Sequence, residues 1–337
     1  MGIAGLNRSR RTVLLACCAA LVVAVAVAVV VAVGPERHQS STVSRAPRRS
    51  SRSVPRAAAS PPAPVGGPPW LVRTATIEIV DPTRGSPARG AVAGHPGRQL
   101  RTTLRWPVSA TGTVAPGVLP LMVFAHGYAT TAATYSTLLD DLARSGVVVA
   151  APELPGESTA YPGPPVESDL QNEPCDLGFV GDWLERHPPA GLAAALTSAP
   201  VIVAGHSDGA TAAAWAAYVS SCSSTPIRAV VALSANDVPM TEAFRFGPAP
   251  ALFAISGTAD EVNPLAHTVA LYRHVPGPAW LLTLAGGDHE GTFTTDPDLA
   301  RTAGLVGDFV AVVARGDLAA RTALGAGGGG RFVLQSR

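Results

Sequence analysis

The sequence predicts an α/β fold in which helices flank a mainly parallel sheet of eight strands. From residue 70 onward, short apolar runs alternate with longer helical patterns. The later runs are apolar at almost every position, as is typical of parallel strands buried on both faces. The first two runs follow each other with no helical pattern between them, so we expect the sheet to begin with two directly joined strands.

The predicted elements can be given by residue range. The strands are Thr74–Val80, Leu100–Trp106, Leu119–Ala125, Val147–Ala151, Val201–Ala204, Ala229–Leu233, Ala251–Ile255 and Trp280–Leu284. The helices are Thr131–Ser145, Asp176–Arg186, Asp208–Ser220, Pro264–Arg273 and Leu299–Ala314. Only residues 234–250 separate the sixth strand from the seventh, so the fold is expected to lack a large lid.

Charge is distributed unevenly along the 337 residues. Residues 1–69 contain nine Arg and one acidic residue, whereas residues 70–337 contain sixteen Arg and twenty-three acidic residues. The predicted folded part is therefore acidic, which argues against a nucleic-acid partner.

The N-terminal part indicates a membrane or export segment. A basic N-terminus, residues 1–12, precedes the uncharged apolar run 13–33, which at about 1.5 Å per residue can cross a hydrocarbon layer of about 30 Å. We expect a transmembrane anchor, but Ala24-Val25-Ala26 also fits a signal cleavage site. Residues 34–69, rich in Ser, Pro and Arg, are typical of a disordered stalk.

This layout favours a single-pass protein of the cell membrane with its folded domain outside the cytoplasm, or a secreted protein if the segment is cleaved. Arginines also follow the segment, and by the positive-inside rule alone they favour the opposite orientation. The folded domain is expected over residues 70–316, and a flexible glycine-rich tail over residues 317–337.

A Gly-x-Ser-x-Gly motif, residues 205–209, stands between an apolar strand and an Ala-rich helix. A sharp strand-to-helix turn exposes a serine hydroxyl, and the flanking glycines relieve crowding around it. The helix N-terminus also supplies N–H groups for a developing negative oxygen. Chance can produce the bare motif in a glycine-rich chain, but this context predicts Ser207 as a nucleophile and the backbone N–H of Asp208 as an oxyanion donor.

A second oxyanion donor is predicted after the third strand, where the sequence reads His126-Gly127-Tyr128. The loop at this position supplies the other N–H in enzymes with such a serine turn. We therefore expect the backbone N–H of Tyr128 to point at the oxyanion. His126 precedes the serine in the chain, so we expect it to pack the loop rather than to act as a base.

Asp260 and His289 each stand on a loop that follows a predicted strand. The order Ser207, Asp260, His289 is the order of triad residues in this kind of fold, so we predict a catalytic triad in which Asp260 orients His289. Glu261 and Asp237 remain alternative acids. Asp260 could also serve only as a cap for the helix that follows.

The region from Trp70 to Arg315 resembles the α/β-hydrolase superfamily, and within it the dienelactone-hydrolase-like, chlorophyllase-like and cutinase-like bacterial serine esterases. The resemblance implies a secreted or surface carboxylic-ester hydrolase that forms an acyl-enzyme and needs no cofactor. The segments that carry it are the triad motifs, Phe124-Ala125-His126-Gly127-Tyr128, Val147-Val148-Val149-Ala150-Ala151-Pro152-Glu153-Leu154-Pro155-Gly156 and Asp176-Leu177-Gly178-Phe179-Val180-Gly181-Asp182-Trp183-Leu184.

Two departures from these relatives bear on the substrate. Asp208 stands where the polyester hydrolases carry Met, and Leu233-Ser234-Ala235-Asn236-Asp237 lacks their clamping Trp. Polyester cleavage is therefore not implied, and we expect a small or exposed ester, either a small molecule or lipid-like. An amidase or peptidase, a cofactor-free haloperoxidase and a non-catalytic surface protein remain alternatives, and the oligomeric state stays open.

Cys175 and Cys222 could form a disulfide in an oxidising compartment. They lie near the start of one predicted helix and past the end of another, and these helices should run parallel, which could hold the sulfurs apart. No His/Cys cluster has metal-ligand spacing, so we expect no metal site.

Overall fold

The structure is a computed structural model that describes residues 70–219, 222–236 and 249–337. The segments predicted at residues 1–12, 13–33 and 34–69 lie outside these ranges. Among the described residues, no helix has both the length and the apolarity needed to cross a membrane. A transmembrane anchor at residues 13–33 stays a prediction.

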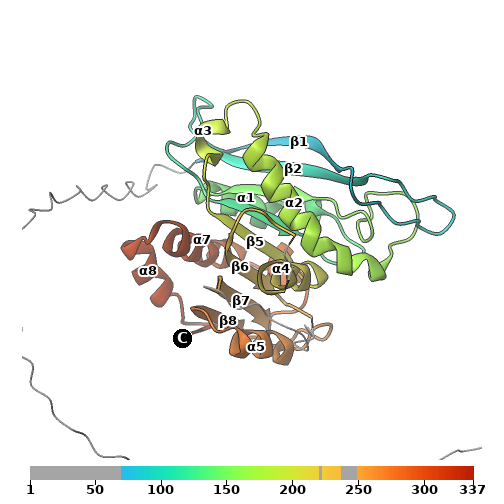
Figure 1. Cartoon of the computed structure of the whole chain (residues 1–337). Coiled ribbons are helices and arrows are strands. Elements are labelled where there is room, and N and C mark those ends of the chain that lie inside the picture. The colour runs from blue at the N-terminus through green and yellow to red at the C-terminus, as the bar shows by residue number, and fades with distance from the viewer. Residues whose placement is uncertain (1–69, 220–221, 237–248) are drawn as a thin grey trace, which may run out of the picture. The chain divides into compact units, whose positions relative to one another are not determined.

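Within the described ranges, nine strands form one sheet in the order β1-β2-β4-β3-β5-β6-β7-β8-β9 (Figure 1). The six central strands, β4, β3, β5, β6, β7 and β8, pair in parallel with one another. At the edges, β1 pairs antiparallel with β2, β2 with β4, and β9 with β8. The strands are Leu71–Asp81 (β1), Arg98–Val108 (β2), Leu121–Ala125 (β3), Val148–Pro152 (β4), Val201–His206 (β5), Ile227–Leu233 (β6), Ala251–Gly257 (β7), Ala279–Leu284 (β8) and Phe332–Ser336 (β9). The predicted mainly parallel sheet is confirmed, with one additional strand.

Helices cover both faces of the sheet (Figure 1). The α-helices are Ser136–Arg144 (α1), Glu173–Arg186 (α2), Ala193–Leu196 (α3), Asp208–Tyr218 (α4), Leu265–His274 (α5), Gly291–Thr294 (α6), Leu299–Arg315 (α7) and Leu318–Gly325 (α8). Two short 3₁₀ helices, Ala132–Tyr135 (η1) and Glu167–Asn172 (η2), precede α1 and α2. The predicted helix at Thr131–Ser145 is therefore divided into η1 and α1.

Two hydrophobic cores, one on each face of the sheet, explain why the central strands are apolar throughout. Along β5, Val201 and Val203 belong to the core under α2, α4 and α5, whereas Ile202 and Ala204 belong to the core under α1 and α7. Because side chains of a strand alternate between faces, a strand covered on both faces must be apolar at every position.

The C-terminal segment corrects one prediction, since residues 317–337 are not a flexible tail. They form α8 and β9, and β9 pairs antiparallel with β8 along its whole length. The glycines that suggested flexibility make the turn between these two elements, where Gly329 and Gly330 have positive φ. Arg301 donates hydrogen bonds to the carbonyl groups of this turn and lies over the ring of buried Phe332.

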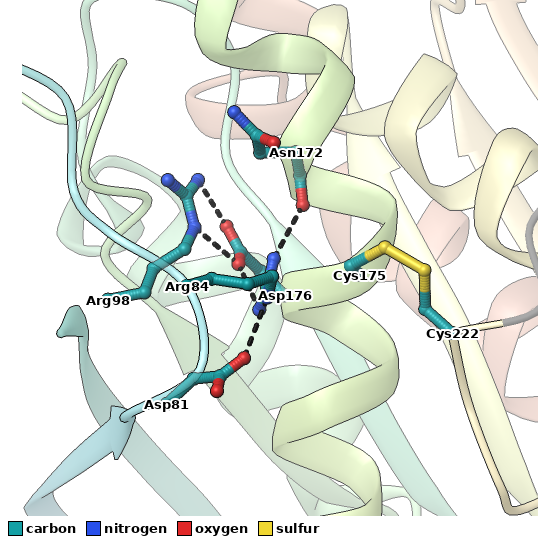
Figure 2. The surroundings of a disulfide bond; sticks show 7 residues. All are labelled: Asp81, Arg84, Arg98, Asn172, Cys175, Asp176 and Cys222. Atoms are coloured by element: carbon teal, nitrogen blue, oxygen red, sulfur yellow. Dashed lines mark hydrogen bonds and ion pairs between the residues drawn. A yellow bond between two sulfur atoms is a disulfide. The ribbon is translucent and has the colours of Figure 1, made fainter. Parts of the chain in front are cut away.

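A disulfide joins Cys175 in the first turn of α2 to Cys222, with Cα atoms 5.0 Å apart (Figure 2). The cysteines are not held apart, because residues 222–225 lie along α2. Ser223 packs against Gly178, and the carboxylate of Asp182 accepts hydrogen bonds from the backbone N–H groups of Ser224 and Thr225.

Removing this disulfide is expected to lower the free energy of unfolding by about 3 kcal/mol, because the bridge constrains a long loop of the unfolded chain. The cysteines are 47 residues apart in sequence. Urea denaturation of the oxidised protein, the reduced protein and Cys222→Ser measures the effect. Dithiothreitol should not change the stability of Cys222→Ser, and equal stability of all three proteins would contradict the prediction.

Candidate active site

Ser207 lies at a strained turn between β5 and α4. Its φ of 56° and ψ of −122° are rarely adopted by residues other than glycine and cost of order 1–3 kcal/mol. The turn is possible because neighbouring glycines let the backbone close tightly. A Cβ atom on Gly205 would lie 2.2 Å from the carbonyl oxygen of Gly209, and one on Gly209 would lie 2.3 Å from that of Ala125.

The structure brings Ser207, His289 and Asp260 together in one hydrogen-bonded chain. The Nε2 atom of His289 lies 3.1 Å from Oγ of Ser207, and its Nδ1 atom lies 3.0 Å from both carboxylate oxygens of Asp260. The contact with Asp260 keeps the proton on Nδ1, so Nε2 is free to accept one from the serine.

The loops after β7 and β8 position the acid and the histidine. A Cβ on Gly257 would lie 2.1 Å from the carbonyl oxygen of Gly287, so only glycine allows this close approach. Asp260 also accepts hydrogen bonds from the backbone N–H groups of Val262 and Asn263. Burial acts to raise the pKa of Asp260, but the hydrogen bonds from His289 and Asn263 outweigh it, and the pKa lies below its usual value.

The alternative acids can now be compared with Asp260. Glu261 is exposed to solvent, and no contact with His289 is seen among the described residues. Asp237 lies outside the described residues. Asp260 therefore contacts the histidine. It does not cap the following helix, Leu265–His274, because the hydrogen bonds that it accepts come from Val262 and Asn263, which precede that helix.

Both predicted oxyanion segments lie next to Ser207. Asp208 is the first residue of α4, so its N–H has no intrahelical partner. Gly127 approaches so closely that a Cβ there would lie 3.2 Å from Cβ of Ser207, and Tyr128 lines the same pocket as Ser207. A pocket of about 170 Å³ opens here, lined by Gly127, Tyr128, Ala129, Thr130, Tyr135, His206, Ser207, His289 and Glu290.

His126 packs the loop, as the sequence indicated. It is fully buried; Nε2 accepts a hydrogen bond from the N–H of Leu154, so the proton is on Nδ1, which donates to the carbonyl oxygen of Gly127. Burial lowers the pKa of His126, so the ring stays neutral.

His206 is a site residue that the sequence alone did not single out. Its buried ring joins Tyr135 to the backbone of His289: the hydroxyl of Tyr135 lies 2.8 Å from Nδ1, and Nε2 donates to the carbonyl oxygen of His289 at 2.9 Å. Burial, and next the charge of His289, lower the pKa of His206 to about 3, so it remains a neutral bridge. Its position next to Ser207 in the Gly-x-Ser-x-Gly motif is the feature of the sequence that could have indicated a place in the site.

The side chain of Asp208, the residue after Ser207, is mostly buried, and the amide of Asn236 lies 3.5 Å from its Oδ1 atom. Burial raises the pKa of Asp208, the contact with Asn236 opposes the rise, and the negative charge of Glu167 adds to it. The carboxyl that follows the serine is thus held in surroundings that disfavour its charge.

The part of the chain that the structure describes contains no group of three or more His, Cys, Asp or Glu side chains placed to hold a metal ion. Comparison with protein families gives a match to the chlorophyllase family over residues 100–239, which includes Tyr128, Ser207 and Asp208. No curated protein matches the chain. The sheet topology is that of the α/β-hydrolase fold, and the chain is similar to the chlorophyllase family over residues 100–239.

Proposed function

We propose that the protein is a serine carboxylic-ester hydrolase that acts through an acyl-enzyme on a small or exposed ester. The hydrogen-bonded chain Ser207–His289–Asp260 at the strained turn is the observation that carries this proposal. The similarity to the chlorophyllase family over residues 100–239 supports it.

In the proposed reaction, Oγ of Ser207 attacks the ester carbonyl while Nε2 of His289 takes its proton. The backbone N–H groups of Tyr128 and Asp208 stabilise the tetrahedral oxyanion. Collapse of this intermediate breaks the ester bond, and the alcohol leaves with the proton from His289. Water, deprotonated by His289, then attacks the acyl-enzyme and releases the acid. These steps need no cofactor.

The size of the pocket supports a short acyl group. At about 170 Å³, it is smaller than the roughly 300–1,000 Å³ of sites that enclose drug-sized ligands. Long acyl chains would therefore extend onto the surface, where they gain less from burial. As part of the same proposal, residues 13–33 anchor the protein in the cell membrane with this domain outside the cytoplasm, unless the segment is cleaved.

A panel of p-nitrophenyl esters from acetyl to dodecanoyl, with acetyl p-nitroanilide as the amide counterpart, tests the activity. We expect kcat/KM to be highest for the shortest acyl groups and turnover of the anilide to be much slower. A fluorophosphonate probe tests the nucleophile in parallel and should label the protein once per chain, at Ser207.

The outcomes separate the alternatives. Faster turnover of the anilide than of the acetyl ester would favour an amidase. If the probe does not label the protein and no substrate is turned over, a non-catalytic protein that kept the fold would be favoured. If kcat/KM were highest for the longest acyl chains, the proposal that the enzyme takes a short acyl group would be wrong.

A further inference from the structure

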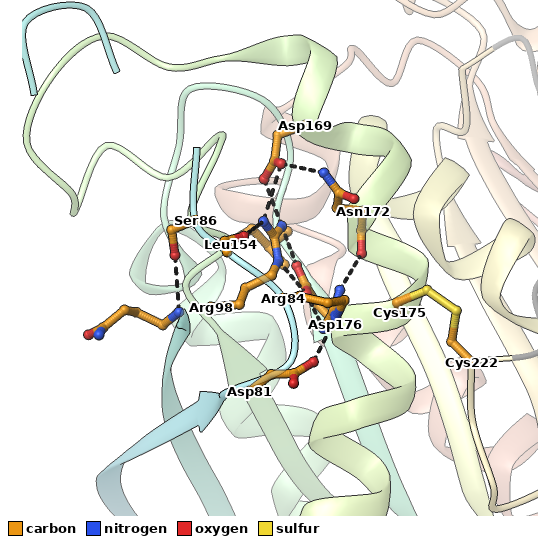
Figure 3. A network of polar contacts seen from close by, with 12 residues as sticks. Asp81, Arg84, Ser86, Arg98, Leu154, Asp169, Asn172, Cys175, Asp176 and Cys222 are labelled. Atoms are coloured by element: carbon orange, nitrogen blue, oxygen red, sulfur yellow. Dashed lines mark hydrogen bonds and ion pairs between the residues drawn. A yellow bond between two sulfur atoms is a disulfide. The ribbon is translucent and has the colours of Figure 1, made fainter. Parts of the chain in front are cut away.

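A cluster of buried charges lies between β2, η2 and α2, with Arg98 at its centre (Figure 3). The guanidinium of Arg98 is fully buried and forms two hydrogen bonds with Asp176, at 2.5 and 2.6 Å, and two with Asp169, at 3.2 and 2.7 Å. Arg84 adds a second cation, 2.8 Å from Asp176 and 2.6 Å from Asp81. These two arginines therefore already face three aspartates.

Two further carboxyl groups, Glu157 and Glu173, are buried beside this cluster. Both are fully inaccessible, and none of their four carboxyl oxygens receives a hydrogen bond from another group in the described chain. The two side chains lie within hydrogen-bonding reach of each other. Two ionised carboxylates cannot bond to each other, because neither has a hydrogen to donate, so the contact is favourable only when a proton is present.

The charges that surround the pair favour keeping that proton. Glu157 faces Glu173 of α2, Asp208 of α4, and Asp169 and Glu167 of η2, all of them acidic. Glu173 faces Asp169 of η2, Asp176 of its own helix and the cation Arg98 of β2, which is already bonded to both aspartates. Burial is the largest cause and these negative charges add to it: the pKa of Glu157 rises to about 8, and that of Glu173 lies well above its usual value.

Glu157 is also linked to both predicted oxyanion segments. Its turn is hydrogen-bonded to the loop after β3 at two points, from the N–H of Leu154 to His126 and from the N–H of Thr159 to the carbonyl oxygen of Thr130. On the other side, the negative charge of Asp208, the first residue of α4, raises the pKa of Glu157. A negative charge at Glu157 would therefore arise next to the carboxyl that adjoins the nucleophile.

We infer that Glu157 and Glu173 share a proton behind the oxyanion hole, and that Glu157 is a positioning residue whose ionisation at alkaline pH slows the reaction. The inference on rate rests on the proposed esterase function, but the shared proton does not. No proton is transferred to substrate: the pair loses one to solvent as pH rises. The resulting charge opposes the oxyanion and repels Asp208.

The rate test compares the pH dependence of kcat/KM for acetyl ester hydrolysis in the wild type, Glu157→Gln and the control Glu78→Gln. Gln retains the shape of Glu and can donate a hydrogen bond to Glu173 without a titrating proton. Glu78 is exposed on β1, so its variant has the same change in net charge away from the site.

We expect the wild type and Glu78→Gln to lose activity several-fold over roughly two pH units above about 8, and Glu157→Gln to lack this decline. The same decline in all three proteins, or none in the wild type, would overturn the positioning role. If Glu157→Gln does not fold, Glu157→Met provides the same comparison, because it too removes the titrating carboxyl group.

Infrared spectroscopy of the wild type tests the proton itself, whether or not the protein is an esterase. A protonated carboxylic acid has a C=O stretching band that a carboxylate lacks. We expect such a band at pH 7 that weakens as pH rises above about 8 and is weaker in Glu157→Gln, which lacks one of the two carboxyl groups. If the wild type lacks this band, the inference of a shared proton is wrong. If the band is present but no ester is hydrolysed, only the proposed function is wrong.

Stability gives a further readout with a defined sign. The raised pKa of Glu157 means that the folded protein keeps a proton that the unfolded chain releases above about 4.5. Its contribution to stability is complete below that pH and is lost as pH rises to about 8. The thermal midpoint of the wild type should therefore fall relative to that of Glu157→Gln across this interval, and parallel midpoints would contradict the shared proton.

Discussion

Ser207→Ala is expected to lower kcat for a p-nitrophenyl ester by about 10⁴- to 10⁶-fold, because the nucleophile and the general base act as one unit. The oxyanion donors and the pocket remain in place, so substrate affinity should change little. Ser336→Ala, on the exposed part of β9, is the control and should keep full activity. Retained turnover in Ser207→Ala would exclude Ser207 as the nucleophile.

Ser207→Gly separates catalysis from strain at the same position. Both variants remove the hydroxyl group, but only glycine removes the Cβ atom from a residue with a φ of 56°. We expect Ser207→Gly to be as inactive as Ser207→Ala and more stable by about 1 kcal/mol, because relief of strain exceeds the entropy cost of glycine. Denaturant titration of both inactive variants measures this difference, and a less stable glycine variant would contradict the strained turn.

The sequence predicted the part of the site that depends on local order. Ser207, Asp260 and His289 each follow a strand, and the carboxyl ends of parallel strands meet at one edge of the sheet. Three residues far apart in sequence could therefore be placed together without any knowledge of side-chain contacts. The central strands were predictable for a related reason, since burial on both faces leaves apolar runs with no polar interruption.

The parts that escaped prediction depend on contacts between distant segments. The glycines at 327–330 indicate flexibility unless the following residues pair with β8, and pairing across about fifty residues leaves no periodic signal. Likewise, Arg98, Glu157 and Glu173 are charged residues that a sequence reader assigns to the surface. Their burial follows from the packing of α2 and η2 against β2, which spacing along the chain does not show.

Arg98→Met should reveal how much of the domain depends on this buried cluster. We expect a loss of about 3–5 kcal/mol in the free energy of unfolding, because Asp169 and Asp176 would stay buried without their cation. Arg144→Met is the matched control: its arginine is half-exposed in a surface ion pair with Asp141, where the same substitution should cost about 1 kcal/mol or less. Urea denaturation of the two variants and the wild type measures both effects.

The pH dependence of that loss distinguishes lost charge compensation from lost packing. Without Arg98, the buried carboxyl of Asp176 is expected to bind a proton more tightly in the folded protein than in the unfolded chain, because burial raises its pKa and Arg98 opposes that rise. The higher pKa of Asp176 would make Arg98→Met lose stability relative to the wild type as pH rises from about 4 to about 7. A deficit of equal size at both pH values would instead assign the effect to the missing side-chain contacts. A deficit that grows with pH would show that Arg98 is needed because acids outnumber bases in this cluster, the same imbalance that leaves Glu157 and Glu173 to share a proton.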